Sequence, residues 1–268
     1  MAGSQRGGPG SKAERVGEKL VPKLRGIGFE LAAQLATKDT YHVLLGSRSS
    51  GKGESAVQEL LSRKLPGSME LVQIDATDDE SIERAAVAVQ RKHGKLDILV
   101  NNAEIENPSS PQRYQVREAF NTNATGPAVV TEAFAPLLKK SAAWPRIVNI
   151  SHGAGSINRI SDTSSPVPEI RQAQYQASKA ALNMATACQW VEYRPFGIQV
   201  FAYDLGVTQP SIGPQNGALN GAKSAVDAVM PLIDILEGRR DAEAGKLLHS
   251  MGSFHWWQVS CINTRLED

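Results

Sequence analysis

The chain has 268 residues, of which 41% are hydrophobic and 21% charged, a composition typical of a globular domain large enough to bury a core. Its 29 basic and 28 acidic side chains give a net charge of +1, which argues against a protein that binds nucleic acid or a membrane surface. No run approaches the ~18 consecutive apolar residues of a membrane helix. Two cysteines, Cys188 and Cys261, are too few for a disulfide framework, so we expect a reducing, cytoplasmic location.

The first 15 residues are dominated by glycine, serine and basic side chains and contain no apolar segment of the kind found in secretory signals. We expect residues 1–15 to be a mobile tail. No linker composition interrupts the rest of the chain, so the sequence predicts one domain over residues 16–268.

Beyond this tail, short apolar runs alternate with longer helical patterns. We expect strands at 41–45, 70–74, 96–100, 146–150 and 198–202, and helices at 28–37, 54–63, 79–93, 121–138 and 175–193. Strands this continuously apolar are typical of a sheet covered on both faces. Alternation of strand and helix predicts parallel strands with crossover helices, and so a doubly wound parallel α/β sheet. Cys188 falls in the last of these helices, and we expect it in the core.

Ligands of such sheets bind outside the carboxyl ends of the strands. The segment Arg25-Gly26-Ile27-Gly28 opens the first helix, where glycines and free N–H groups suit a pyrophosphate. Ser47 and Arg48 follow strand 41–45, the position that reads an adenosine ribose. No acidic residue is present there to bind the 2′-hydroxyl of NAD, and two arginines suit the 2′-phosphate of NADP. Each feature alone is equally typical of a flexible turn or a solvated arginine.

Tyr175 and Lys179 stand four residues apart, on one face of the predicted helix 175–193. A nearby ammonium group favours the phenolate and lowers a tyrosine pKa from ~10. We therefore expect a tyrosine that can exchange a proton near neutral pH. By itself, this spacing is more typical of an ordinary surface pair.

Taken together and in this order, these motifs resemble the short-chain dehydrogenase/reductase family, in particular carbonyl-reductase-like members from filamentous fungi. The other matching positions are Asp75, Asn101, Asn102, Ala103, Asn123, Ser151, Val207 and Thr208, together with the tail segments 241–245 and 254–257. The resemblance covers residues 21–257 and implies a Rossmann-type fold and an NADP-binding oxidoreductase. It implies NADPH-dependent reduction of a carbonyl on a small organic substrate, by analogy in secondary metabolism.

The resemblance also implies the role of each residue. Tyr175 would protonate the carbonyl oxygen, Lys179 would hold the nicotinamide ribose, and Asn123 would support a proton-relay water. Asp75 would contact the adenine. The positions implied to bind the cofactor are Arg25, Gly26, Ile27, Gly28, Ser47, Arg48, Asp75, Asn101, Asn102, Ala103, Tyr175, Lys179, Val207 and Thr208.

Several positions depart from the family pattern. Val21 and Pro22 stand where the family has Thr-Gly, and residues 15–20 lack the apolar run of a first strand. Two explanations stay open: a genuinely weakened cofactor site, or an N-terminal sequence that was wrongly assigned. Glu104 replaces a glycine and is either a solvent-facing loop residue or a charge beside the nicotinamide end.

His152 stands at the position of the family's catalytic serine, so the second hydrogen bond to the substrate is expected from His152, Ser151 or Ser156. The departures also leave a non-redox alternative: a degenerate member that acts as a cyclase, an isomerase or a cofactor-poor scaffold. A longer loop between residues 152 and 175 is expected to wall the substrate pocket, and a monomer or a homo-oligomer both fit. The remaining histidines, His42, His93, His249 and His255, show no metal-ligand spacing, so no metal site is expected.

Overall fold

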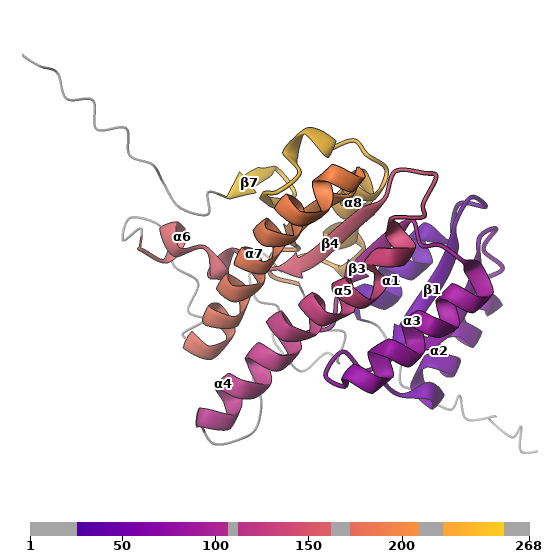
Figure 1. Ribbon diagram of the computed structural model, residues 1–268, viewed down its shortest axis with the longest axis horizontal. Helices are drawn as coiled ribbons and strands as arrows, with labels where there is room; N and C mark the ends of the chain where they lie inside the picture. Colours follow the sequence, from indigo (N-terminus) through magenta and orange to yellow (C-terminus); the bar gives the residue numbers. More distant parts are fainter. Residues whose placement is uncertain (1–25, 107–111, 162–171, 209–221, 255–268) are drawn as a thin grey trace, which may run out of the picture.

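The computed structural model describes residues 26–106, 112–161, 172–208 and 222–254, and Figure 1 shows their arrangement. The five predicted strands are confirmed. They are β1 (His42–Ser47), β2 (Ser68–Gln73), β3 (Ile98–Asn101), β4 (Arg146–Ser151) and β5 (Gln199–Asp204). A short antiparallel pair near the C-terminus, β6 (Leu247–His249) and β7 (Gly252–Phe254), was not expected from the sequence.

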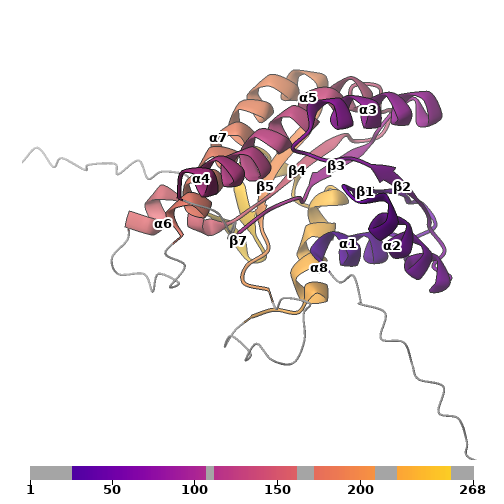
Figure 2. The same cartoon turned by 90° about the horizontal axis from the view of Figure 1, so that it is seen from below.

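Two layers of helices enclose the sheet, as the doubly wound prediction requires (Figure 2). One layer contains α1 (Ile27–Leu35), α2 (Ser50–Ser62) and α8 (Ala225–Leu236); the other contains α3 (Asp79–His93), α4 (Gln112–Phe120), α5 (Gly126–Leu138) and α7 (Ala173–Tyr193). Shorter turns are α6 (Ile157–Ser161), a π-helical turn at Asn121–Thr125, and 3-10 turns at Gly153–Gly155, Arg194–Phe196 and Asp241–Glu243. No helix in the described part is long and apolar enough to cross a membrane.

The helices differ from the sequence prediction at several points, and α4 and α8 were not expected from the sequence. The predicted helix 121–138 begins with the π-helical turn, because the Gly126 N–H bonds to the Asn121 carbonyl and Pro127 has no N–H to continue a regular ladder. Gly126 also packs on the chain after β2, where a Cβ would lie 2.6 Å from the Ala76 carbonyl oxygen. Cys188 is exposed on α7, so its assignment to the core was wrong: it lies on the face of the helix turned away from the sheet.

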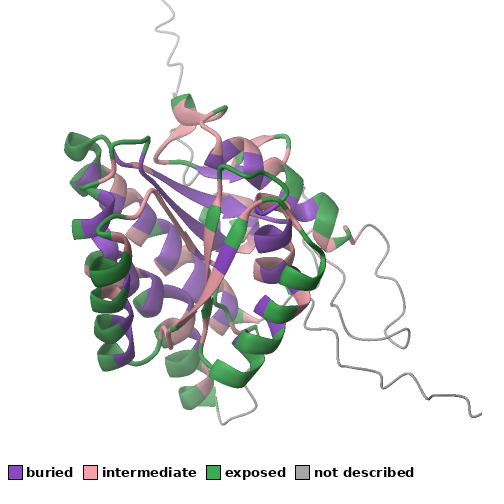
Figure 3. Cartoon of the chain, turned by 90° about the vertical axis from the view of Figure 1, so that its right-hand side faces the viewer, coloured by how far each residue is buried: buried purple, intermediate pink, exposed green. Residues whose placement is uncertain are grey.

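The strands differ in burial according to their neighbours (Figure 3). All six residues of β4 are buried, whereas β1 is largely intermediate or exposed and only Asn101 of β3 is buried. The described strands form a five-stranded sheet in the order β3-β4-β5-β6-β7 and a separate parallel pair, β1-β2. Within the described ranges, β1 pairs only with β2, and β3 pairs only with β4. The first strand considered at residues 15–21 lies outside the described residues.

Candidate active site

The candidate active site lies where the chain leaves the carboxyl ends of β3 and β4 and meets α7. Tyr175 and Lys179 occupy the face of α7 that packs on β4, with exposed fractions of 5% and 0%. The Lys179 Nζ donates a hydrogen bond of 2.9 Å to the Ile150 carbonyl oxygen near the end of β4. That bond fixes the ammonium group directly beneath the loop that follows the strand. The predicted pair is therefore buried at the sheet edge rather than on the surface.

Glu104 contacts both members of this pair. Its Oε2 lies 2.7 Å from the Lys179 Nζ and accepts a longer hydrogen bond, 3.4 Å, from the Tyr175 hydroxyl. The Glu104 side chain is 42% exposed, so the carboxylate reaches inward from the surface. Of the two readings of Glu104 drawn from the sequence, the structure favours the charge beside the site.

Asn123 places the loop that carries Glu104. Its side chain binds the backbone of Ile105 twice, accepting from the N–H and donating to the carbonyl at 2.8 Å each. It also donates to the Ser178 hydroxyl at 3.0 Å and is fully buried. The π-helical turn projects Asn123 toward α7, away from the regular positions of a continuous helix. Asn123 thus positions the residue that immediately follows Glu104.

Of the three candidates for a second hydrogen-bond donor, His152 lies against Tyr175, with ring centroids 5.9 Å apart in an edge-to-face arrangement. Its Nδ1 accepts the Ala154 N–H at 2.9 Å, so the neutral ring carries its proton on Nε2 and can donate there. The Ser151 hydroxyl instead donates to Asn183 Oδ1 on α7 at 2.5 Å. Ser156 is buried, and its hydroxyl accepts the Arg159 N–H at 3.3 Å.

The pKa of Tyr175 is raised well above its ordinary value of 10. Burial is the largest cause, because the charged phenolate is disfavoured away from water, and the negative charges of Glu104, Glu106 and Asp204 add to it. The prediction that Lys179 lowers this pKa was wrong, because burial of the phenol raises it and the nearest partner of the ammonium group is the Glu104 carboxylate. The raised pKa favours the protonated form of the Tyr175 hydroxyl.

The N-terminus of α1 lies against the loop that follows β3. Gly26 caps the helix in an extended conformation and makes no side-chain cap, and the first N–H groups of a helix have no intrahelical acceptor. A Cβ on Gly28 would lie 3.0 Å from Asn102 Nδ2, so only glycine permits this approach without a shift. Ile27 lies between the two glycines. Ala103, the residue after Asn102, is exposed. The two glycines fit a phosphate-binding turn; Arg25 lies outside the described residues.

Residues at the neighbouring strand ends bind mostly to the protein itself. Arg48 is exposed after β1. Burial alone would raise the pKa of Asp75, but the hydrogen bonds from Thr77, together with the Arg48 charge, lower it below its ordinary value. The Asp75 carboxylate accepts the Thr77 N–H and hydroxyl at 3.0 and 2.7 Å, and the Ser47 hydroxyl donates to the Ser49 carbonyl at 2.9 Å.

Three further predicted cofactor positions, Asn101, Val207 and Thr208, are also held by protein contacts. Asn101 is buried, and its amide donates to Asn149 Oδ1 at 2.8 Å and to the Thr131 hydroxyl at 3.0 Å. Its side chain therefore supports the sheet edge from within. After β5, the Val207 carbonyl accepts the Lys223 N–H at 2.9 Å, and Thr208 forms an isolated bridge with Lys223.

Asp204, at the end of β5, was not among the predicted site residues, yet it joins two loops of the site. Its two carboxylate oxygens accept the Gly153 N–H at 2.8 Å and the Gly206 N–H at 2.7 Å. Gly206 has φ +77°, a conformation that favours glycine. The signal was present in the sequence, since an acidic residue directly after an apolar strand falls at the ligand-binding edge of the sheet.

Comparison with known proteins agrees with this geometry. The family model of short chain dehydrogenases matches residues 23–218. The short-chain dehydrogenase anuI of Penicillium roqueforti is 36% identical, over 87% of this chain and 94% of its own. The short-chain dehydrogenase/reductase tropE of Talaromyces stipitatus is 33% identical, over 83% and 91%. The crystal structure of NADPH-bound carbonyl reductase from chicken fatty liver is similar with a TM-score of 0.73 and 29% identity, covering 87% of this chain and 95% of that one.

The chain therefore belongs to the short-chain dehydrogenase/reductase family. Its fold is the Rossmann-type α/β fold of that family, and members of the family are oxidoreductases that act on small molecules.

Proposed function

We propose that this protein is an NADPH-dependent reductase that converts a carbonyl group of a small organic substrate into an alcohol, in fungal secondary metabolism. The observation that carries the proposal is the buried Tyr175, a neutral phenol beside Lys179 and the His152 ring at the carboxyl edge of the sheet. The NADPH-bound carbonyl reductase that resembles this chain supports the choice of cofactor and reaction, and its fungal relatives support the setting.

The proposed cofactor site has two ends. The glycine turn Gly26–Gly28 at the start of α1 would hold the pyrophosphate, Arg48 would pair with the 2′-phosphate, and Lys179 would bind the nicotinamide ribose. When bound, NADPH supplies the hydride that this chemistry requires. The protein contributes binding, orientation and protons.

Two side chains would act on the carbonyl oxygen. The Tyr175 hydroxyl donates the proton, and its raised pKa keeps that proton in place until negative charge develops on the substrate. The His152 Nε2–H supplies a second hydrogen bond in place of the serine hydroxyl usual at this position. Asp204 holds the loop after His152 through the Gly153 N–H.

Glu104 would limit cofactor binding, because its carboxylate lies on the Lys179 ammonium group that the ribose requires. Removing it is therefore the sharpest test. We expect Glu104→Gly to bind NADPH about tenfold more tightly, as the loss of one charge-assisted contact predicts. Glu106→Gly is the matched control, since it removes a neighbouring carboxylate for which the structure shows no contact with Lys179. NADPH titration by fluorescence, followed by NADPH oxidation with small aldehydes and ketones, measures both steps.

The proposal fails if neither the natural protein nor Glu104→Gly binds NADPH, or if bound NADPH is oxidised by no carbonyl in the panel. A second function is favoured by Glu104 itself: with Tyr175 and His152 it gives three proton-exchanging groups within one site. These suit a cyclase or isomerase that needs no hydride. Product formation without loss of NADPH absorbance, abolished by Glu104→Gln, would establish that alternative.

A further inference from the structure

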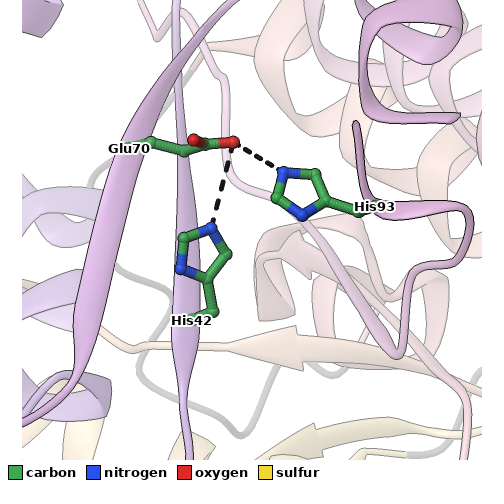
Figure 4. A group of neighbouring side chains, drawn as sticks. All are labelled: His42, Glu70 and His93. Carbon is green, nitrogen blue, oxygen red and sulfur yellow. Dashed lines mark hydrogen bonds and ion pairs between the residues drawn. The ribbon is translucent and has the colours of Figure 1, made fainter. Parts of the chain in front are cut away.

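Three potential metal ligands lie close together toward the amino-terminal ends of β1 and β2, whereas the candidate active site lies at the carboxyl ends of the strands. His42 is the first residue of β1, Glu70 lies in β2, and His93 is the last residue of α3 (Figure 4). In sequence they are widely separated, which is why spacing gave no sign of them. Parallel pairing of β1 with β2, and the end of α3 at Gly94, bring them together.

Their geometry is close to that of a metal site. Glu70 Oε1 lies 2.6 Å from His93 Nε2 and 3.9 Å from His42 Nε2, and one ligand atom from each of the three residues lies within 4.8 Å of the others. Ligands around a tetrahedral zinc ion, with bonds of about 2.0–2.2 Å, stand about 3.4 Å apart. Small rotations reach this spacing, and all three side chains have the freedom to make them, being 23–42% exposed.

Two neighbouring side chains affect the proposed ligands: Ser68 orients His42, and Lys92 competes with a metal ion for Glu70. The His42 Nδ1 is 2.7 Å from the Ser68 hydroxyl, and donation there leaves the Nε2 lone pair directed at Glu70. Lys92 forms an ion pair with the other Glu70 oxygen, Oε2, and so leaves Oε1 for an ion while opposing its charge. Two imidazoles and a carboxylate are a ligand set that zinc accepts, with water in the fourth position.

We propose that His42, Glu70 and His93 form a site for a zinc ion that joins β1 and β2 to α3. The consequence is structural. α3 packs on α5 and, in the same apolar cluster, on Leu44 of β1 and Val72 of β2, so the ion would reinforce a contact between strands and helix at its exposed end. The unfolded chain does not hold the three ligands together, so zinc would stabilise the folded state.

The test is calorimetric titration of the full chain with zinc chloride, together with the melting temperature in the presence and absence of zinc. We expect one equivalent to bind and to raise the melting temperature. His42→Asn and His93→Asn should each weaken binding by at least about tenfold, since loss of even an outer-shell partner costs about 10–100-fold. His249→Asn is the matched control, another partly exposed histidine outside the cluster, and should bind zinc like the unchanged chain.

Absence of zinc binding in the unchanged chain, or asparagine variants that bind zinc as tightly as the unchanged chain, would overturn the proposal. A variant that removes no ligand gives an independent answer if those variants fold poorly. Lys92→Gln removes the competing cation from a side chain that is 64% exposed, and should bind zinc more tightly. Unchanged or weaker binding by Lys92→Gln would also contradict the site.

Discussion

The two parts of the sheet carry different halves of the proposed chemistry and differ in how completely they are enclosed. β4 and β5, each paired on both sides, are buried almost throughout and support α7 with its Tyr175–Lys179 pair. β1 and β2 support the proposed adenosine end of the cofactor site, and most of their residues are intermediate or exposed. Strands of similar apolar sequence thus differ in burial within the described residues, where β4 pairs on both sides and β1 pairs with β2 alone.

The departures from the family pattern fall in both parts, since Glu104 and His152 lie beside Tyr175, whereas Val21 and Pro22 stand at the start of the chain, outside the described residues. The buried side chains around Tyr175 keep their hydrogen bonds, and the proposed cofactor half also involves the start of the chain. If that is the weak point, changes to the catalytic half should abolish turnover, and changes to the cofactor half should alter affinity.

Tyr175→Phe should give the largest effect. Removing the proton donor should lower turnover by about 10²–10⁴-fold, the usual contribution of general-acid catalysis, while the dissociation constant for NADPH changes little. Tyr193→Phe, at the buried C-terminal end of the same helix, is the control and should retain turnover. Steady-state kinetics with a reducible carbonyl measure both. Unchanged turnover in Tyr175→Phe would transfer the role to another group, most plainly His152.

Core substitutions compare the stability of the two parts directly. Ile147→Ala in β4, where the side chain is fully buried, should lower the free energy of unfolding by about 2–5 kcal/mol. Leu44→Ala in β1 should cost roughly half as much, because its side chain is only partly buried. Urea denaturation at equilibrium gives both values. Equal losses would mean that β1 is as fully enclosed as β4, and the contrast between the two parts would fail.

Arg48→Asp tests the cofactor half. Loss of a charge-assisted contact with the 2′-phosphate, together with the new negative charge, should weaken the binding of NADPH by at least about tenfold and leave the binding of NADH nearly unchanged. Arg91→Asp on α3 makes the same charge change away from the strand ends. Fluorescence titration with both cofactors gives the ratio. A protein that binds NADPH and NADH equally before substitution would remove the basis for this preference.

The pH dependence of turnover examines Tyr175 without mutation. Because burial and Glu104 raise the pKa of Tyr175 above 10, the donating phenol is present at every pH below that value. Turnover in the reducing direction should therefore show no loss from Tyr175 between about pH 7 and 10. The sign reverses for alcohol oxidation, which needs the phenolate and should be slow over the same range. A fall in reduction centred near neutral pH would contradict the raised pKa.

The smallest effect is expected at the start of the chain. Pro22 lacks an N–H and has a restricted φ, so it replaces poorly the family's glycine. Val21→Thr with Pro22→Gly should tighten NADPH modestly, and limited proteolysis with NADPH bound reports whether residues before Gly26 become protected. No gain in affinity leaves two readings: the natural turn already fits the cofactor, or no first strand is present to support it. Protection of residues 15–25 indicates the first, and cleavage up to Gly26 the second.

The sequence by itself was enough for the class of fold, the five main strands and the family. Continuous apolar runs and motif spacing are local properties, and they place Tyr175, Lys179 and Asn123 without any knowledge of tertiary contacts. Tertiary structure decided the rest. The pKa of Tyr175 depends on burial and on Glu104, which approaches from a loop 71 residues earlier in the chain. His152 faces the phenol while Ser151 turns to α7, a choice made by side-chain packing. His42 and His93 meet only because strand pairing and helix length bring distant residues to one end of the sheet.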